Sequence, residues 1–433
     1  MHQTSTPSLS DLLAGAKNAL DRNDLAGAKK LSDLAILAAP NNPNPYLLAG
    51  RIAGREGRWG DAIDHFRHCA AVAPAAAAPH FWMGSTFREI GNNENALAAF
   101  KVANRLSPRE PATIFNLGLS YLALGDHASA GEEFVLAAQL SGKVFDAQAH
   151  QNAIECALAL AEVPYPGEPY ESARIQTTDD PMVSIVCCSI TPKKANALRK
   201  NLEKLLVEQH WEFVVIDDAH SLSEGYIRGI AKSTGDVVVL CHDDIEIIVD
   251  DFYERLIDAL TNVDIVGVAG TTLVNGPAVF WARHPYCHGW VTHSNAQGDL
   301  IPTPMSMAPP RVDGAQALDG VFIAAHRKVF DRVQFDPITF DGFHFYDLDF
   351  TYRAFLAGLR VRIQCDILLI HASEGNFGQD HSRYAERFAS KFPGVGAAPP
   401  SPPITFRSAA RDKKTVRNLY RWLTVWALKA SSS

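Results

Sequence analysis

The sequence of 433 residues predicts two domains of different class, an all-α repeat solenoid followed by an α/β domain with a mostly parallel sheet. Pro40, Pro74 and Pro108 follow one another at a spacing of 34 residues, which is the period of a stacked helix-turn-helix repeat. From residue 182 onward, short apolar runs alternate with segments of helical spacing, which is the rhythm of βαβ units. With 47% hydrophobic and 20% charged residues, the composition is that of a folded protein and excludes global disorder.

Other positions in the first third of the chain keep the same 34-residue register. Small residues recur at Gly50, Gly84 and Gly118, where they would let two helices approach each other. Bulky residues recur at Phe66, Phe100 and Phe134, where they would fill the seam between the helices. This pattern resembles tetratricopeptide repeats over about residues 8–142. We expect a repeat domain at residues 1–162, in which 147–162 form a closing helix over the fourth repeat.

The first helix of each repeat should line the inner face of the solenoid. Four side chains are candidates for an acceptor groove on that face: Arg51, Phe81, Arg88 and Phe115. Exposed aromatic residues beside arginines are typical of a binding surface, so we expect a protein partner or acceptor segment to lie there. The alternative is a purely structural or dimerising array.

Polar side chains close two neighbouring strands of the second domain, which we place at residues 182–392 after a linker at 163–181. Strands are predicted at 182–191, 211–218 and 236–244, and the second and third end in Asp217, Asp218, His242, Asp243 and Asp244. Because the carboxyl ends of parallel strands meet at one edge, these groups should face one crevice.

Carboxylates gathered at one edge repel one another unless a cation or hydrogen-bond donors compensate, which favours a divalent metal site. The alternative is that these acids cap a following helix or turn. Residues 163–390 carry 19 basic and 31 acidic residues, which suits a cation site and argues against a nucleic-acid partner. No glycine-rich phosphate loop follows the first strand, which disfavours dinucleotide-binding oxidoreductases and phosphate-loop NTPases.

Three further motifs follow the third strand. They are Asp319-Gly320, a helix start carrying Asp347 and Asp349, and His371 after an apolar strand. In this order, the motifs from the first strand onward resemble the family 2 glycosyltransferases over about residues 182–392. The resemblance implies the metal-dependent type A transferase fold and a nucleotide-sugar donor, for which we expect UDP as the nucleotide.

The resemblance also implies a role for each matching residue. Asp244 and His371 match residues of the metal site, for Mn²⁺ or Mg²⁺, and Asp347 matches the catalytic base. Contacts to the nucleotide-sugar are implied for Asp217, Asp218, His242, Asp243 and Asp319. The sequence departs from the family pattern at two positions that are normally acidic, where it has His242 and Tyr346.

Transfer with inversion is expected, because one base candidate is apparent and no second carboxylate is placed as a covalent nucleophile. A repeat array joined to a transferase predicts a polypeptide acceptor. A polysaccharide or lipid-linked acceptor is one alternative. A binding scaffold with an inactive transferase domain is another, because of the departures at His242 and Tyr346.

The cysteines and the two ends of the chain bear on location. Seven cysteines, an odd number without a CxxC pair, predict buried thiols in a reducing compartment, and the first residues lack a signal-peptide pattern. We therefore expect a cytoplasmic protein. Residues 393–433 predict a Pro/Ala linker and a basic amphipathic helix at 413–429. Docking of this helix on the protein is the favoured interpretation, and peripheral contact with the inner membrane face is the alternative.

Overall fold

The structure is a computed structural model, and it describes residues 7–140, 146–162, 180–276, 286–295, 297–373, 379–395 and 408–432. The chain divides into two compact units, Met1–Ser141 and Gly142–Ser433, and each is described by itself. Most of the predicted linkers at 163–181 and 394–403 lies outside the described residues.

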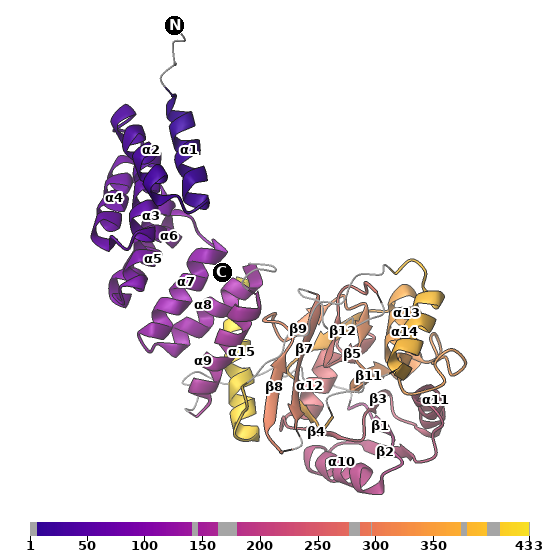
Figure 1. The fold of residues 1–433 in the computed structure, drawn as a ribbon. Coiled ribbons are helices and arrows are strands. Elements are labelled where there is room, and N and C mark those ends of the chain that lie inside the picture. The colour runs from indigo at the N-terminus through magenta and orange to yellow at the C-terminus, as the bar shows by residue number, and fades with distance from the viewer. Residues whose placement is uncertain are drawn as a thin grey trace. The chain divides into compact units, whose positions relative to one another are not determined.

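The first unit consists of helices that pack as consecutive antiparallel pairs (Figure 1). In chain order they are α1 (Leu9–Asp21), α2 (Leu25–Ala38), α3 (Pro43–Arg55), α4 (Trp59–Val72), α5 (Ala77–Glu89), α6 (Asn93–Leu106), α7 (Pro111–Ala123) and α8 (His127–Leu140). The pairs α1–α2, α3–α4, α5–α6 and α7–α8 are therefore four helical hairpins, one for each repeat of the sequence.

A glycine and a phenylalanine pack together in successive hairpins. A Cβ atom at Gly84 of α5 would lie 2.8 Å from the Phe100 ring of α6, and that ring is fully buried. The same contact recurs between Gly50 and Phe66 and between Gly118 and Phe134. The 34-residue register is thus confirmed as a packing register, because only a residue without a side chain lets the ring lie against the facing helix.

We expect Phe100→Ala to lower the free energy of unfolding of this unit by about 3–5 kcal/mol, because it leaves a cavity against Gly84. Urea unfolding of the full chain, followed by circular dichroism, measures the change. Leu37→Ala is the control, because Leu37 is 78% exposed and should change stability little. An unfolding curve of Phe100→Ala that overlays the wild-type curve would contradict the expectation.

The second unit contains two sheets (Figure 1). The seven-stranded sheet has the order β2-β1-β3-β11-β5-β12-β9, and the six-stranded sheet has the order β10-β6-β7-β13-β4, with β8 paired to β7. The strands of the first sheet are β1 (Val183–Cys188), β2 (Trp211–Ile216), β3 (Val237–Cys241), β5 (Ile265–Gly267), β9 (Arg311–Asp313), β11 (Phe322–His326) and β12 (Val361–Gln364). Those of the second are β4 (Ile245–Ile247), β6 (Ala269–Thr271), β7 (Cys287–Ser294), β8 (Leu300–Pro304), β10 (Ala317–Leu318) and β13 (Leu369–His371).

The larger sheet is mixed, so the prediction of a mostly parallel sheet is wrong. Strand β1 is parallel to β2 and β3, as its βαβ pattern predicts, but β11 is antiparallel to both β3 and β5. Strand β9 is also antiparallel to β12. Between β5 and β11 the described residues form only short strands, so the helical crossover that a parallel neighbour requires is missing from this part of the described chain.

The helices of this unit are α9 (Asp146–Ala161), α10 (Pro192–Leu205), α11 (Leu222–Lys232), α12 (Phe252–Ala259), α13 (Tyr346–Leu356), α14 (Gln379–Lys391) and α15 (Lys413–Ser432), with a 3-10 turn at Arg327–Val329. The predicted closing helix, α9, groups with this unit rather than with the repeats, and it packs against α15. Asn418 of α15 donates a hydrogen bond of 2.7 Å to the carbonyl of Ala161 in α9.

The basic tail helix α15 is docked, as the favoured interpretation expects. Tyr420 stacks on Trp290 of β7 at 5.5 Å between ring centroids, and Trp426 is fully buried. Its apolar face is thus covered by the protein. Among the described residues, no helix combines the length and the apolar character that a membrane crossing needs. All seven cysteines are free thiols, and only Cys188 is not fully buried.

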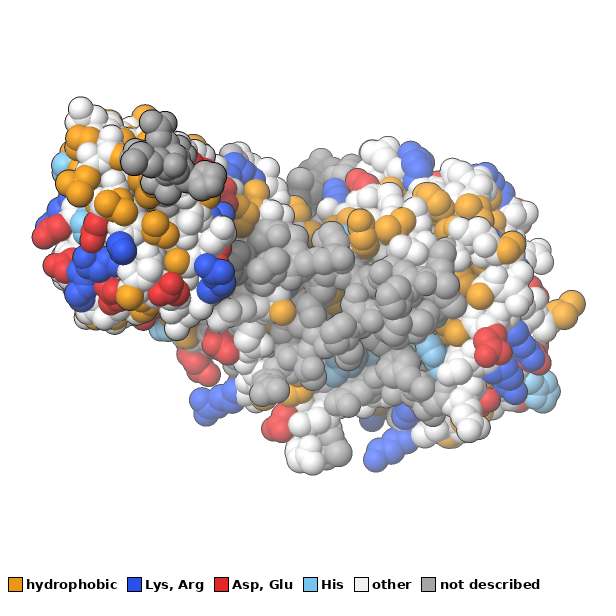
Figure 2. All heavy atoms as spheres, turned by 45° about the horizontal axis from the view of Figure 1, so that its top comes forward, with side chains coloured by type: hydrophobic (Ala, Val, Ile, Leu, Met, Phe, Trp, Pro, Cys, Tyr) orange, Lys and Arg blue, Asp and Glu red, His pale blue; other side chains and the backbone are white. Residues whose placement is uncertain are grey.

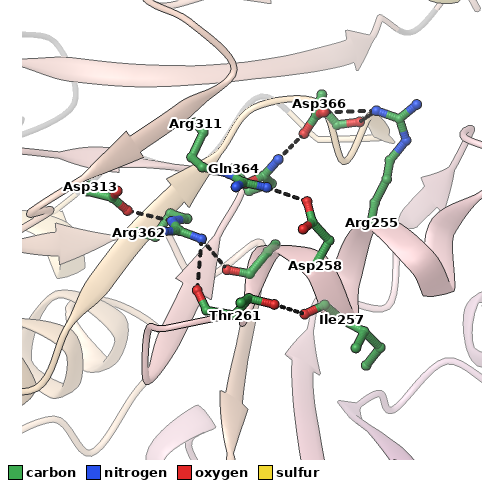
Figure 3. A network of polar contacts seen from close by, with 10 residues as sticks. Arg255, Ile257, Asp258, Thr261, Arg311, Asp313, Arg362, Gln364 and Asp366 are labelled. Carbon is green, nitrogen blue, oxygen red and sulfur yellow. Dashed lines mark hydrogen bonds and ion pairs between the residues drawn. The ribbon is translucent and has the colours of Figure 1, made fainter. Parts of the chain in front are cut away.

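A polar network holds the edge strands β9 and β12 to α12 (Figure 3). Arg362 of β12 pairs with Asp313 of β9 and donates a 2.8 Å hydrogen bond to the carbonyl of Ala259. Arg255 of α12 pairs with the buried Asp366 at 2.9 Å. Because buried charges are costly unless paired, these ion pairs fix the edge of the larger sheet. On the face shown in Figure 2, basic, acidic and hydrophobic side chains of the described residues intermingle.

Candidate active site

The end of β3 lies at the centre of the candidate site. Strand β3 is fully buried and passes into His242, Asp243 and Asp244 before β4 begins. A cavity of about 300 Å³ opens here. The described residues that line it are Cys188, Ser189, Ile190, Ala219, Leu222, Tyr226, His242, Asp243, Asp244, Phe343 and Ser373. Of the five polar groups predicted to face one crevice, His242, Asp243 and Asp244 line this cavity.

Three potential metal ligands converge beside this cavity. Nδ1 of His242 lies 3.2 Å from Nε2 of His371, which in turn lies 3.3 Å from Oδ1 of Asp244. All three ligand atoms lie within 4.8 Å of one another. His371 reaches the site because β13 pairs with β4, the strand that follows Asp244. The structure thus brings together the two residues predicted as metal ligands, and it adds His242, which the sequence suggested for nucleotide-sugar contact.

The electrostatics of this cluster favour an ionised Asp244. Burial alone would raise the pKa of Asp244, but the hydrogen bond from His371 and the nearby His371, His242 and Lys194 hold it well below its ordinary value. Burial lowers the pKa of His242, and the neighbouring His371 lowers it further. A carboxylate beside two imidazoles is a donor set for a divalent cation once the ligand nitrogens carry no proton.

Two further polar residues, which the sequence analysis did not single out, lie beside Asp243 and Asp244. Lys194, in the first turn of α10, lies 3.3 Å from Oδ2 of Asp244 and 3.5 Å from Oδ1 of Asp243. Ser189, just after β1, donates a 2.7 Å hydrogen bond to Asp243. Their position directly after the first strand was the available signal, because that strand end shares the edge with β3. Lys194 adds a positive charge to this edge of the site.

The candidate base, Asp347, lies in the first turn of α13. Its Oδ2 accepts a 2.7 Å hydrogen bond from the backbone N–H of Gly320. Burial and the nearby Asp319 raise the pKa of Asp347 to about 7. Glycine is required at 320, because a Cβ atom there would lie 2.0 Å from the Tyr346 hydroxyl and 3.0 Å from Cβ of Asp347. The Asp319-Gly320 motif thus lets its backbone approach the start of α13.

The residue before this helix has a strained backbone. Phe345 has φ of 63°, in the left-handed region that a bulky residue rarely adopts. Its buried ring is held beside His381 and Phe388 of α14, at 5.0 and 5.8 Å between ring centroids. Strain of this kind persists only where the surroundings enforce it, and it often accompanies functional sites. Here it sets the direction in which Tyr346 and Asp347 leave the turn.

Tyr346 links the candidate base to the metal-ligand cluster. Its hydroxyl lies 3.1 Å from Nε2 of His242 and donates a hydrogen bond of 3.3 Å to the carbonyl of Gly320. The two departures from the family pattern, His242 and Tyr346, are therefore in contact with each other. Asp347 and the cluster at His242 consequently belong to one connected site.

Other predicted residues lie apart from this centre. Asp217 and Asp218 are exposed, and neither is among the described residues that line the cavity. Asp218 is 71% exposed and pairs with Arg228 at 2.8 Å. Asp349 is structural, because its carboxylate is 1% exposed and pairs with Arg353 and Lys391 at 2.6 and 2.7 Å.

The predicted acceptor groove needs correction. Phe115 is only 5% exposed and packs on Phe134, and Phe81 packs on Phe100 at 5.7 Å between ring centroids. Both rings turn into the seam between helices rather than toward a groove. Arg88 is half-buried and is not among the described residues that line the nearby pocket.

A pocket of about 390 Å³ is nevertheless present on α3 and α5 of the repeat unit. Arg51 lines it, as predicted, and its guanidinium lies 4.9 Å from the ring centroid of Trp82. The other described lining residues are Leu20, Gly50, Gly54, Arg55, Trp59, Phe66, Ser85, Thr86 and Glu89. An arginine stacked on tryptophan beside an open pocket is a composition found at binding hot spots.

Comparison with known proteins identifies the second unit. Residues 184–392 match the model of a family described as "Glycosyltransferase like family". A comparison with curated proteins found no match.

Similar solved structures include MamA from Desulfovibrio magneticus RS-1, which is 16% identical with a TM-score of 0.32 over 35% of this chain and 84% of that chain. A thermophilic TPR protein of Thermus thermophilus is 19% identical with a TM-score of 0.31 over 35% of this chain and 83% of that chain. An O-GlcNAc transferase mutant of Thermobaculum terrenum is 17% identical with a TM-score of 0.27 over 50% of this chain and 38% of that chain.

The family match and the geometry of the strand-end site agree, and the match supports a glycosyltransferase. The chain therefore carries a domain of the glycosyltransferase-like family at residues 184–392, preceded by a helical repeat region that resembles tetratricopeptide repeats.

Proposed function

We propose that this chain is a metal-dependent, inverting glycosyltransferase that moves a sugar from a nucleotide-sugar, expected to be UDP-linked, to an acceptor hydroxyl on a protein. The observation that carries the proposal is that a candidate catalytic base lies next to a candidate metal site. Asp347, whose pKa is raised to about 7, directly follows Tyr346, and Tyr346 contacts the cluster of His242, Asp244 and His371.

Sugar transfer by a single displacement needs a base at the acceptor hydroxyl and positive charge at the departing diphosphate. Asp347 would take the acceptor proton as the hydroxyl oxygen attacks the anomeric carbon. The donor set of His242, Asp244 and His371 fits a divalent cation such as Mn²⁺ or Mg²⁺, which would offset the diphosphate charge. Lys194, beside Asp244, would add to that positive charge.

The repeat unit supports a protein acceptor. Its pocket combines a stacked arginine and tryptophan with a second arginine, Arg55, and a second tryptophan, Trp59. Aromatic and arginine side chains supply much of the affinity of protein interfaces. We therefore place the recognition of an acceptor segment at Arg51 and Trp82 rather than at Phe81 and Phe115.

We expect Arg51→Ala combined with Trp82→Ala to weaken transfer to the natural protein acceptor by about 1–3 kcal/mol in kcat/KM. Hydrolysis of the donor without acceptor should not change, because the pocket belongs to the repeat unit and the strand-end site to the other. The control is Lys101→Ala combined with Tyr121→Ala, a similar cation–π pair outside the pocket lining. Equal losses for both double variants would exclude specific recognition at this pocket.

The whole proposal is tested by incubating the purified chain with Mn²⁺ and a panel of nucleotide-sugars, and by measuring release of the nucleotide diphosphate. Turnover of one donor is expected, and a protein acceptor should accelerate it. Turnover that only a polysaccharide or lipid-linked acceptor accelerates would contradict the protein acceptor. An absence of turnover with every donor would favour an inactive binding scaffold. A cytoplasmic location is part of the proposal and is supported by the seven free thiols.

A further inference from the structure

The spacing of the three ligand atoms is that of a coordination sphere. Bonds of about 2.1 Å from a metal to nitrogen or oxygen place neighbouring ligand atoms about 3.0–3.4 Å apart. Nδ1 of His242 and Nε2 of His371 are 3.2 Å apart, and Nε2 of His371 and Oδ1 of Asp244 are 3.3 Å apart. Two of the three distances between the ligand atoms therefore match the distance between neighbouring ligands of one metal ion.

Tyr346 decides which nitrogen of His242 can bind a metal. Its hydroxyl proton is donated to the carbonyl of Gly320, so the hydroxyl oxygen is left to accept a hydrogen bond from Nε2–H of His242. This leaves the lone pair of His242 on Nδ1, the nitrogen that faces His371. A metal-binding histidine typically donates its other ring N–H to an oxygen in this way, which fixes its tautomer and ring orientation.

Tyr346 is itself held firmly. It is nearly fully buried, its ring lies beside those of Tyr226 and Phe335 at 5.7 and 6.3 Å between centroids, and its hydroxyl occupies the space that a side chain at position 320 would need. The hydroxyl therefore has a fixed position from which it orients the imidazole.

Among the described residues, the other carboxylate oxygens around the cluster already have hydrogen-bond or ion-pair partners. Asp243 accepts a hydrogen bond from Ser189 and lies beside Lys194. Lys194 also takes Oδ2 of Asp244, which leaves Oδ1 for an ion. The His, Cys, Asp and Glu ligand atoms that the described residues bring together are thus two imidazole nitrogens and one carboxylate oxygen.

Resting on the proposed cation site, we propose that Tyr346 positions His242 as a third metal ligand, and that the resulting site prefers transition ions to Mg²⁺, with Co²⁺ above Mn²⁺ and Mn²⁺ above Mg²⁺. Imidazole nitrogens suit the later transition metals, whereas Mg²⁺ favours oxygen ligands, and affinity at a given site rises from Mn²⁺ to Co²⁺. Tyr346 acts as a positioning residue through His242.

Metal titration of the full chain, without donor, tests the inference. Isothermal titration calorimetry with MgCl₂, MnCl₂ and CoCl₂ should give affinities that rise in that order, with Co²⁺ at least about tenfold tighter than Mg²⁺. The visible absorption of bound Co²⁺ reports its ligands directly. Equal affinities for Mg²⁺ and Co²⁺ would overturn the inference.

Two variants separate positioning from general stability. Tyr346→Phe should weaken Co²⁺ binding by about 10–100-fold and change the Co²⁺ spectrum. Its matched control is Tyr420→Phe, which also removes one buried hydroxyl, but one that bonds to the carbonyl of Val291 instead of to His242. Equal effects of the two variants on Co²⁺ binding would overturn the positioning role. His242→Asp, which replaces nitrogen with oxygen, should reduce the preference for Co²⁺ over Mg²⁺, and an unchanged preference would contradict the role of His242.

The same titration distinguishes this inference from the proposed function. Tight Co²⁺ binding by a protein that turns over no donor would support the metal site and overturn the transferase. Donor turnover by a protein that binds none of the three ions would overturn the metal site and leave the transferase standing.

Discussion

Asp347→Asn is expected to lower kcat by about 10²–10⁴-fold and to leave donor affinity nearly unchanged. Asparagine keeps the shape of the side chain and can still accept the hydrogen bond from Gly320, but it cannot take a proton from the acceptor. Single-turnover kinetics with a saturating donor measure the chemical step, and thermal shift with the same donor measures its binding. An Asn variant with near-normal turnover would move the base elsewhere, and Asp319 would be the next candidate.

The pH dependence gives a second measure of the same residue. Because the pKa of Asp347 is raised to about 7, its basic form is lost as the pH falls through 7, and kcat/KM should decline about tenfold per unit below that point. A carboxyl whose pKa is higher in the folded state stabilises the fold only while it is protonated. This contribution is lost as the pH rises from about 4 to 7. Asp347→Asn should therefore be more stable than the wild type at pH 8.

Asp349→Asn is the matched control for the base, since it changes a carboxylate in the same helix turn. The pairs with Arg353 and Lys391 predict that this variant loses stability, because one buried charge partner disappears. Its kcat per folded molecule should stay near the wild-type value. A loss in kcat equal to that of Asp347→Asn would mean that the position of α13, rather than proton transfer, sets the rate.

Asp244→Ala is expected to abolish metal-dependent donor binding, because it removes the carboxylate of the cluster and one of the two acidic partners of Lys194. Thermal shift with the donor, in Mn²⁺ and in excess chelator, reports the loss, since a ligand that binds only the folded state raises its stability. Wild-type protein should show a shift in metal and none in chelator.

Glu246→Gln controls for the charge change at Asp244. Glu246 lies two residues further on, in β4, and its carboxylate pairs with Lys413 at 2.6 Å on the surface. Exposed pairs of this kind contribute little to stability, so donor binding should stay at the wild-type level. Donor affinity that is equal in metal and in chelator would contradict the proposed metal dependence.

The sequence predicted those features of the fold that depend on residues close together along the chain or on a regular spacing. The Gly84–Phe100 contact recurs every 34 residues, so the repeat was readable without a structure. The first three strands were also readable, because each is a short apolar run followed by helical spacing. The mixed larger sheet was not, since β9 has only 3 residues and its partner β12 lies far away in the sequence.

The candidate site could be assembled only in part for the same reason. The acids after β3 were visible, but the contact between His242 and Tyr346 joins residues 104 positions apart. Arg51, which repeat spacing suggested for a groove, lines the pocket, but the spacing could not give the rotation of α5 about its own axis. Trp82, one residue or about 100° further round the helix than Phe81, is the aromatic residue that lines it.

The pairing of α9 with α15 has a consequence for synthesis of the chain on the ribosome. Asn418 and Ala161, which hold the two helices together, are separated by 257 residues. The surface of α9 that receives α15 stays open while all of the intervening strands are made. At about 5–20 residues per second, the wait is on the order of ten seconds to a minute. During this interval Trp290 also lacks the ring of Tyr420 that covers it, so the nascent chain exposes an apolar patch that a holding chaperone could shield.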